Sequence, residues 1–128
     1  MATQVTQDVR ISVKAEYSHE QSDPKAGRFL FSYRIRIENR GARTVQLLRR
    51  HWRIVDSLFE PREVKGPGVV GATPVLATGE HFTYTSFCDL RSAFGRMSGT
   101  YTMRHTDDDS GFDVVIPPFE LVYPIAAN

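Results

Sequence analysis

The stretch FLFSYRIRIE, from Phe29 to Glu38, decides the fold class. Its apolar and polar residues alternate with a period of two, which places them on opposite faces of a β-strand and fits no helical stripe. The apolar positions carry aromatic and aliphatic side chains that suit a half-buried, pleated surface. The stretch therefore predicts a strand whose core face is formed by Phe29, Phe31, Tyr33, Ile35 and Ile37.

The same alternation recurs along the chain between turn-forming residues. It predicts further strands over residues 9–17, 62–65, 81–87, 99–105, 112–116 and 119–123. A longer strand over residues 45–57 changes phase between Leu47 and Trp52, which a β-bulge repairs by adding one unpaired residue. The nearest helix candidate, residues 90–97, is interrupted by Gly95. The pattern predicts an all-β sandwich of about seven to nine strands, of the immunoglobulin or fibronectin type III kind.

Proline and glycine mark the connections between these strands. Pro117 and Pro118 cannot donate to a ladder, so they predict a bend or an edge between the last two strands. Residues 107–111 are polar and predict a hairpin turn. Residues 66–79 contain several glycines and prolines, which predicts irregular structure there.

Length and composition fit one domain. The chain has 128 residues, of which 41% are hydrophobic and 24% are charged, so a disordered or fibrous protein is excluded. We expect a single domain over residues 1–128, with an ordered core at about 9–123. The formal net charge of +1 is far from the basic footprint of dedicated nucleic-acid binders. Nucleic acid is therefore not an expected partner.

The sequence also predicts a compartment. Cys88 is the only cysteine, so the chain forms no intramolecular disulfide and suits a reducing environment. The first ten residues lack the apolar run of a signal peptide, and no stretch reaches the length of a membrane span. These features predict a cytoplasmic protein that does not enter a membrane.

The search for chemistry gives no catalytic set, no metal site and no cofactor. Ser86 and Cys88 lie close together in the sequence, but neither sits in a nucleophile elbow and no base can be assigned to them. The four histidines lack the close spacing of a zinc site. The aspartates of residues 107–109 fail as a calcium loop, because Phe112 stands where a glycine is needed. We therefore expect a protein that is not an enzyme.

One motif does invite a ligand. The run GPGVVG at residues 66–71 matches the G-x-G-x-x-G pattern of dinucleotide-binding folds, but Pro74 and Gly79 exclude the helix on which that mechanism depends. Two interpretations stay open. The glycines form a tight crossover between the sheets, or the loop amides bind phosphate. The phosphate site would consist of Lys65, Gly66, Gly68, Gly71 and Arg62.

Several segments together resemble the bacterial ApaG family. They are residues 20–24 (EQSDP), 45–52 (VQLLRRHW), 64–71 (VKGPGVVG), 84–86 (YTS), 99–101 (GTY) and 116–119 (IPPF). The resemblance covers residues 9–123 and implies a fibronectin type III-like sandwich. It also implies an association with cobalt and magnesium tolerance, and a gene neighbourhood shared with a diadenosine tetraphosphate hydrolase. In eukaryotes a similar domain is part of an F-box protein and of a polymerase delta-interacting protein, which implies protein interaction.

These observations lead to two functional hypotheses. The first is a non-enzymatic binding module that recognises an unidentified protein partner through a sheet face or an exposed edge strand. The alternative is a sensor of a phosphate-containing small molecule, such as pyrophosphate or a diadenosine polyphosphate, at the glycine-rich loop of residues 66–71. An enzyme acting on such nucleotides ranks last, because it needs a general base and a metal site.

Overall fold

The computed structural model describes residues 1–124. This part of the chain has nine strands and one short 3-10 helix, which confirms the all-β prediction. The elements are β1 (Ala2–Thr6), β2 (Val9–Tyr17), η1 (Pro24–Ala26), β3 (Phe29–Asn39), β4 (Val45–Asp56), β5 (Arg62–Pro67), β6 (Val75–Leu76), β7 (His81–Leu90), β8 (Phe94–His105) and β9 (Gly111–Val122).

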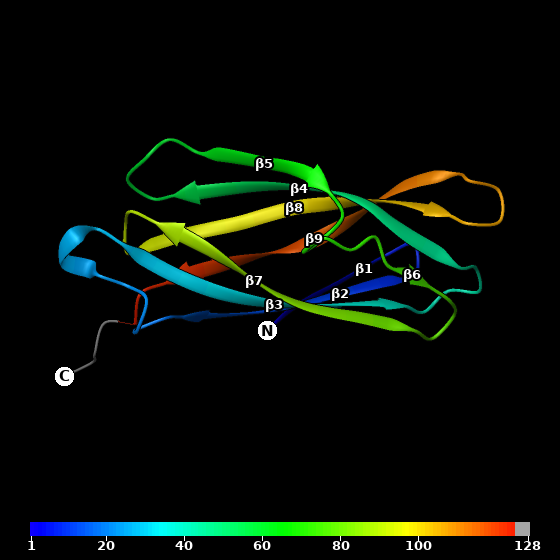
Figure 1. Cartoon of the computed structure of the whole chain (residues 1–128), viewed down its shortest axis with the longest axis horizontal. Helices are drawn as coiled ribbons and strands as arrows, with labels where there is room; N and C mark the ends of the chain where they lie inside the picture. The colour runs from blue at the N-terminus through cyan, green and yellow to red at the C-terminus, as the bar shows by residue number, and fades with distance from the viewer. Residues whose placement is uncertain (125–128) are drawn as a thin grey trace.

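The strands form two antiparallel sheets that pack face to face. One has the strand order β1-β2-β3-β7 and the other β5-β4-β8-β9, with β6 pairing with β4. Figure 1 shows them as an upper and a lower layer. The sheet that contains β3 places Val13, Ile35 and Tyr84 side by side. Hydrophobic side chains of the two inner faces fill the space between the layers. Val13, Ile35 and Tyr84 are each at most 7% exposed.

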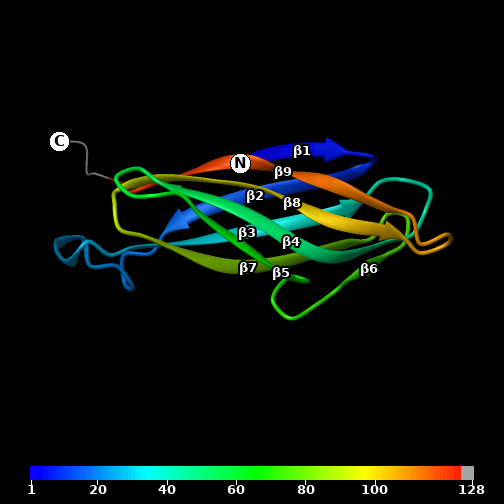
Figure 2. The same cartoon turned by 90° about the horizontal axis from the view of Figure 1, so that it is seen from above.

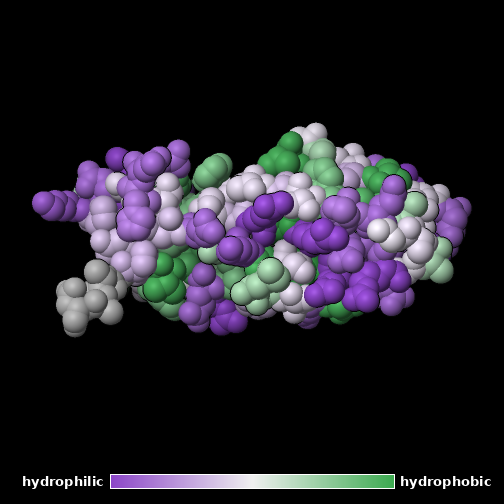
Figure 3. All heavy atoms as spheres, turned by 90° about the horizontal axis from the view of Figure 1, so that it is seen from below, coloured by the Kyte–Doolittle hydropathy of each residue, from purple (hydrophilic) through white to green (hydrophobic). Residues whose placement is uncertain are grey.

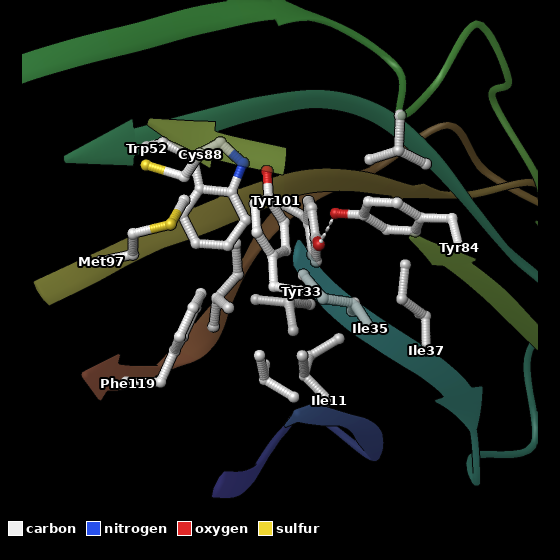
Figure 4. Close-up of a cluster of buried hydrophobic side chains, with 14 of the residues drawn as sticks. Ile11, Tyr33, Ile35, Ile37, Trp52, Tyr84, Cys88, Met97, Tyr101 and Phe119 are labelled. Atoms are coloured by element: carbon white, nitrogen blue, oxygen red, sulfur yellow. Dashed lines mark hydrogen bonds between the residues drawn. The ribbon is translucent and has the colours of Figure 1, made fainter. Parts of the chain in front are cut away.

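Aromatic rings occupy the middle of this core. Tyr33 of one sheet meets Trp52 of the other edge to face, with ring centroids 5.5 Å apart, and Trp52 also meets Phe119 at 5.9 Å. Such geometry stabilises aromatic pairs beyond the burial of their area. Figure 4 shows these side chains between the ribbons, together with Tyr101 and Tyr84.

Strand β4 contains the predicted bulge. Its register against β8 shifts between Leu47 and Arg49, so Leu48 is the extra residue. After the bulge, every second residue from Arg50 to Asp56 faces the other sheet, and Trp52 is 2% exposed. The bulge therefore places Trp52 in the core, as predicted, and it also turns an arginine inward.

Predicted boundaries were wrong at two places, and one strand was not predicted. Residues 94–97, inside the helix candidate, belong to β8, where Met97 pairs with Phe119. The last two predicted strands are one strand, β9, because Pro117 and Pro118 together face the single residue Ser98 and form a second bulge. Residues 2–6 form β1, although their alternation is weak because β1 is largely exposed.

The two long sides of the sandwich differ. On one side β1 and β2 lie against β9, where the amide of Val115 donates to Oγ1 of Thr6 at 3.3 Å. On the other side β5 and β7 are the last strands of their sheets and do not pair with each other. Figure 2 shows β1 and β9 along one side, and β5, β6 and β7 along the other. We call these the closed side and the open side.

The outer face of the β1-β2-β3-β7 sheet is hydrophilic. Figure 3 shows this face with polar side chains over most of it and apolar ones scattered between them. Lys14, Arg34 and Arg36 are exposed there, as the alternation predicts. In residues 1–124 no helix is long and apolar enough to cross a membrane.

Candidate functional site

The glycine-rich loop ends in a tight turn. The amide of Val69 donates to the carbonyl of Ala72 at 2.8 Å, and the amide of Ala72 donates back to Val69 at 2.9 Å. The two residues between them, Val70 and Gly71, have positive φ angles of 42° and 79°. These are the features of a type I′ turn. Val69 itself is fully buried, so the loop covers the open side and is anchored by that side chain.

Gly68 is required for the path of this loop. Its φ is +60°, and a Cβ atom there would lie 2.3 Å from the carbonyl oxygen of Ala72. Its amide donates to the carbonyl of Leu48, the bulged residue of β4, at 2.8 Å. The amides of Gly68, Val69 and Ala72 are therefore used within the fold. The predicted crossover between the sheets was wrong, because the loop connects β5 with β6 and both of these strands pair with β4.

Gly66 makes room for Arg50. The two residues are opposite each other in the β4–β5 ladder, and a Cβ atom on Gly66 would lie 3.0 Å from Nη2 of Arg50. The guanidinium extends across this space, and its Nη1 donates to the carbonyls of Pro67 at 2.9 Å and Gly68 at 3.0 Å. Arg50 thus ties the loop to β4. Within residues 1–124 it has no carboxylate partner.

The structure does not bring together the two cations proposed for the loop. Arg62 lies on the inner face of β5, opposite Ile54, and its Nη2 is 3.3 Å from the carboxylate of Asp89 on β7. Lys65 is three positions further along and faces outward, opposite His51. Arg62 is therefore engaged by the other sheet, and Lys65 is on the opposite face of the strand.

A groove runs along the open side between β5 and β7. It consists of two adjoining cavities of about 230 Å³ and about 200 Å³. Both are lined by Tyr33, Arg50, Trp52 and Ser86, so these residues lie where the cavities meet. We call this the β5–β7 groove. Val64, Arg62 and Asp89 line one end of it, and Val69, Val70 and Tyr84 line the other.

The inner wall of the groove contains tyrosine hydroxyls. Tyr84 and Tyr101 are hydrogen-bonded to each other through their hydroxyls, as the dashed line in Figure 4 shows. Burial raises the pKa of Tyr33, Tyr84 and Tyr101, while the charge of Arg50 acts to lower it. All three tyrosines therefore stay neutral at physiological pH, and Tyr33 and Tyr84 contribute neutral hydroxyls to the wall beside the guanidinium of Arg50.

The rim of the groove is apolar and exposed. Val64 on β5 is 37% exposed, Val70 in the loop is 59% exposed, and Phe87 on β7 is 57% exposed. Single exposed apolar residues are ordinary, but these three gather around one groove. The backbone edge of β7 runs alongside, since β7 pairs with β3 and with no other strand in the described part of the chain.

The other candidate residues are dispersed. Cys88 is 4% exposed and burial raises its pKa to about 11, so it is a thiol rather than a thiolate at neutral pH. Across residues 1–124, no three His, Cys, Asp or Glu side chains are grouped so that they hold a metal ion. Asp108 accepts hydrogen bonds from the amide and hydroxyl of Ser110, which confirms the turn predicted there.

Comparison with known proteins places this geometry in a family. The model of the ApaG domain matches residues 19–105. Protein ApaG of Anaeromyxobacter dehalogenans is 49% identical over 128 residues, which is all of both chains. Protein ApaG of Paramagnetospirillum magneticum is 49% identical over 124 residues, covering 97% of this chain and 95% of its own. This chain belongs to the ApaG family.

Solved structures agree with the ApaG assignment. The crystal structure of the putative ApaA protein from Bordetella pertussis has a TM-score of 0.88 at 42% identity, and the match covers 93% of this chain and 96% of that one. A protein from Archaeoglobus fulgidus has a TM-score of 0.52 at 11% identity, which shows a shared fold alone. The ApaG domain match spans β3 to β8 and so includes the residues named above as lining the β5–β7 groove.

Sequence reasoning did not find Arg50 as a groove residue. Continuing the alternation of residues 45 and 47 without a bulge would assign Arg50 to the outer face of β4. The position of the extra residue decides on which face Arg50 lies. Arg50 shares the inner face with Trp52 because the bulge at Leu48 precedes both residues. Arg50, Trp52 and Ile54 follow one another at intervals of two residues in this ApaG sequence. This spacing was the signal that Arg50 faces inward together with Trp52.

Proposed function

We propose that this ApaG chain is a non-enzymatic binding module that recognises a protein partner on its open side. The occupant is an extended segment of the partner, which pairs with the free edge of β7 and packs on the rim of the β5–β7 groove. One observation carries the proposal: a free strand edge, an apolar rim and a groove lie together on one side of the sandwich.

The edge of β7 supports this proposal first. All ten residues of β7, His81 to Leu90, pair with β3 along one edge of the strand, and the opposite edge faces the open side. Unpaired amides and carbonyls on a strand of that length are a template for another strand, and proteins shield such edges when they are not used. Arg62 covers the end of this edge, where its Nη2 donates to the carbonyl of Asp89, and β7 has no proline and no inward lysine to shield the rest. An added strand is the mode of recognition that fits this edge.

The chemistry of the inward-facing groups supports a binding role over an enzymatic one. The buried thiol of Cys88 has its pKa raised to about 11, which disfavours the thiolate that a nucleophile needs. The tyrosines on the groove wall are held neutral by burial. The family resemblance also implies an association with cobalt and magnesium tolerance. We propose that this chain acts on that tolerance through the partner that it binds.

The proposal is tested with peptides, because the partner has no name. Unstructured peptides as long as β7 are selected from a display library on the full chain, and the selected peptides are titrated into the isotope-labelled protein. We expect amide shifts along β7 and at residues 62–70. Shifts confined to the closed side, or a library without any binder, would contradict the proposal.

A matched pair of variants sharpens this test. Phe87 and Phe94 are both exposed phenylalanines, at 57% and 44%, but Phe94 starts β8 and does not line the groove. We expect F87K to weaken a selected peptide about fivefold to tenfold, because the rim loses apolar area, and F94K to leave it unchanged. Equal effects of the two substitutions would place the binding surface elsewhere.

The phosphate sensor remains the alternative, and it gives a different result in the same sample. Titration with pyrophosphate, ATP and diadenosine tetraphosphate would shift the amides of Gly66, Gly68 and Gly71 if the loop binds phosphate. We expect no such shifts, because the Gly68 amide already bonds Leu48 and the cations of Arg62 and Lys65 diverge.

A further inference from the structure

We propose that Arg50 forms a carboxylate-binding subsite in the β5–β7 groove, which takes an acidic side chain of the partner segment. This inference rests on the proposed function for the identity of the ligand and names the chemistry that the groove selects. The subsite consists of the guanidinium of Arg50 with the hydroxyls of Ser86 and Tyr33, all of which line both cavities of the groove.

The position of Arg50 is unusual for a charged residue. It faces the interior of the sandwich and is half-buried, with Trp52 and Ile54 as the next inward residues of its strand. Charged side chains in such positions are normally paired, because desolvation of an unpaired charge is unfavourable. Each of Arg43, Arg62 and Arg104 has an aspartate within 3.3 Å. In the described residues, Arg50 has none.

The guanidinium also has donors to spare. Its Nη1 serves the carbonyls of Pro67 and Gly68, which fixes the plane of the group above Gly66. No protein acceptor in residues 1–124 bonds Nε or Nη2. An arginine with a fixed plane and free donors is matched to the planar, two-oxygen geometry of a carboxylate. Loop anchoring therefore accounts for one nitrogen of Arg50 and leaves the other two for a ligand.

The charge of the groove selects a carboxylate over a phosphate. A phosphate monoester carries nearly two negative charges at neutral pH and is bound by clusters of cations. Here Arg62 is neutralised by Asp89, and Lys65 lies on the outer face of β5. Among the groove residues that the structure describes, Arg50 is the one unpaired positive charge. The hydroxyls of Ser86 and Tyr33 add neutral donors, which suit a single carboxylate.

The geometry of β7 connects the subsite to the partner segment. Ser86 faces the groove from β7, opposite Tyr33 of β3, so a strand added at the free edge of β7 runs directly beside the subsite. Side chains of that strand alternate between the two faces, and the inward ones enter the groove. One acidic residue at an inward position reaches Arg50, and its neighbours two residues away face Val64 and Val70. The outward residues of the added strand lie beside Phe87.

The subsite is tested with two probes on the full chain. The first is sodium acetate, titrated while the Nε–Hε signal of Arg50 is followed by NMR, with acetamide as the neutral control. We expect a saturable shift with acetate and none with acetamide. The second is a selected peptide that binds β7, compared with forms in which each Asp or Glu is replaced by Asn or Gln. We expect one position at which the amide binds at least about tenfold more weakly.

Variants separate this site from general charge attraction. R50Q and R53Q remove the same charge from β4, but Arg53 is exposed on the outer face. We expect R50Q to abolish the difference between the acidic and the amide peptide, R50K to keep part of it, and R53Q to keep all of it. Circular dichroism and β7 amide shifts of each variant confirm that it is folded.

The outcomes for the two proposals differ. Peptides that bind at β7 with no preference for an acid, together with an unshifted Arg50 signal, would overturn the subsite and leave the binding module intact. An acetate shift without any peptide at β7 would overturn the binding module and leave the Arg50 site intact. An equal loss of acid preference in R50Q and R53Q would assign the preference to bulk charge and overturn the subsite.

Discussion

The closed and open sides of the sandwich are built from the same kind of strand but end differently. On the closed side β1, β2 and β9 cover one another, and apolar residues such as Ile11 and Ile116 have no exposed surface. On the open side the last strands stay apart, and a loop with one buried valine lies over the gap. The difference teaches that contact between the two sheets closes one long side, while the other side presents a strand edge and a charged group.

The largest effect is expected when one side chain on each side of the sandwich is shortened to alanine. Ile11 is 0% exposed and Val64 is 37% exposed. We expect I11A to lower the free energy of unfolding by about 3–4 kcal/mol, and V64A by less than about 1 kcal/mol, because only the first leaves a cavity. Chemical denaturation followed by tryptophan fluorescence measures both values. Similar losses would mean that the open side is as tightly packed as the closed one.

The next test concerns the loop that covers the open side. We expect G68A to lower the free energy of unfolding by about 2–3 kcal/mol, because it adds strain at a positive φ and a clash with the carbonyl of Ala72. G71A is the matched control: its φ is +79°, but a Cβ atom there meets nothing within 4 Å. We expect it to cost about 1 kcal/mol. Equal costs would show that the close contact at Gly68 relaxes freely.

A rise in pH should also act first on the open side. The folded-state pKa of Cys88 is raised to about 11, and that of Tyr84 is raised as well, so the unfolded chain loses these protons first. The folded state keeps its full stability with respect to these two groups at pH values below their pKa values in the unfolded chain. We expect this stability to fall by about 1.4 kcal/mol per pH unit for each group while the pH lies between the two pKa values.

Denaturation curves collected from pH about 8.5 to about 10.5 test this expectation. C88A should reduce the slope of stability against pH in the lower part of that range. An unchanged slope in C88A would show that the thiol is not the group responsible.

The smallest expected effect is at the tip of the loop. Val70 has a φ of 42°, a conformation that β-branched residues strongly disfavour, and it is 59% exposed. We expect V70N to raise the free energy of unfolding by about 0.5–1 kcal/mol, because asparagine suits a type I′ turn. If Val70 is retained for its place on the rim, the same variant will bind a selected peptide more weakly. A gain in stability with unchanged binding would remove Val70 from the rim.

The sequence predicted the fold well because most strands have one buried face. The period of two at residues 29–38 is unambiguous, and the bulge in β4 follows from the need to bury both Leu47 and Trp52. β1 was missed because it is mostly exposed and carries little alternation. The first residues of β8 were missed because residues 90–97 were considered as a helix candidate. Gly95, which interrupts that candidate, lies in β8 and makes room for Leu90, whose Cδ1 would lie 2.6 Å from an added Cβ.

The candidate site was less accessible from the sequence. The glycine motif stood out in the sequence, but its role depends on which groups occupy the space that a side chain would fill. The guanidinium of Arg50 lies beside Gly66, and the carbonyl of Ala72 lies beside Gly68. Both contacts depend on the three-dimensional structure. Similarly, Lys65 and Arg62 are near each other in the sequence, and only the pairing of β5 with β4 shows that they face opposite ways. The open side itself arises from the strand order, which no local pattern encodes.

The bulge at Leu48 has a consequence for how this chain can change through evolution. The residue that interrupts the β4 ladder is the one whose carbonyl receives the amide of Gly68, so the interruption in one strand is the anchor of the loop over the groove. Loss of the extra residue would keep Trp52 inward but remove that anchor. Among relatives, we therefore expect the bulge and the glycine at this loop position to be gained and lost together, as one inherited unit.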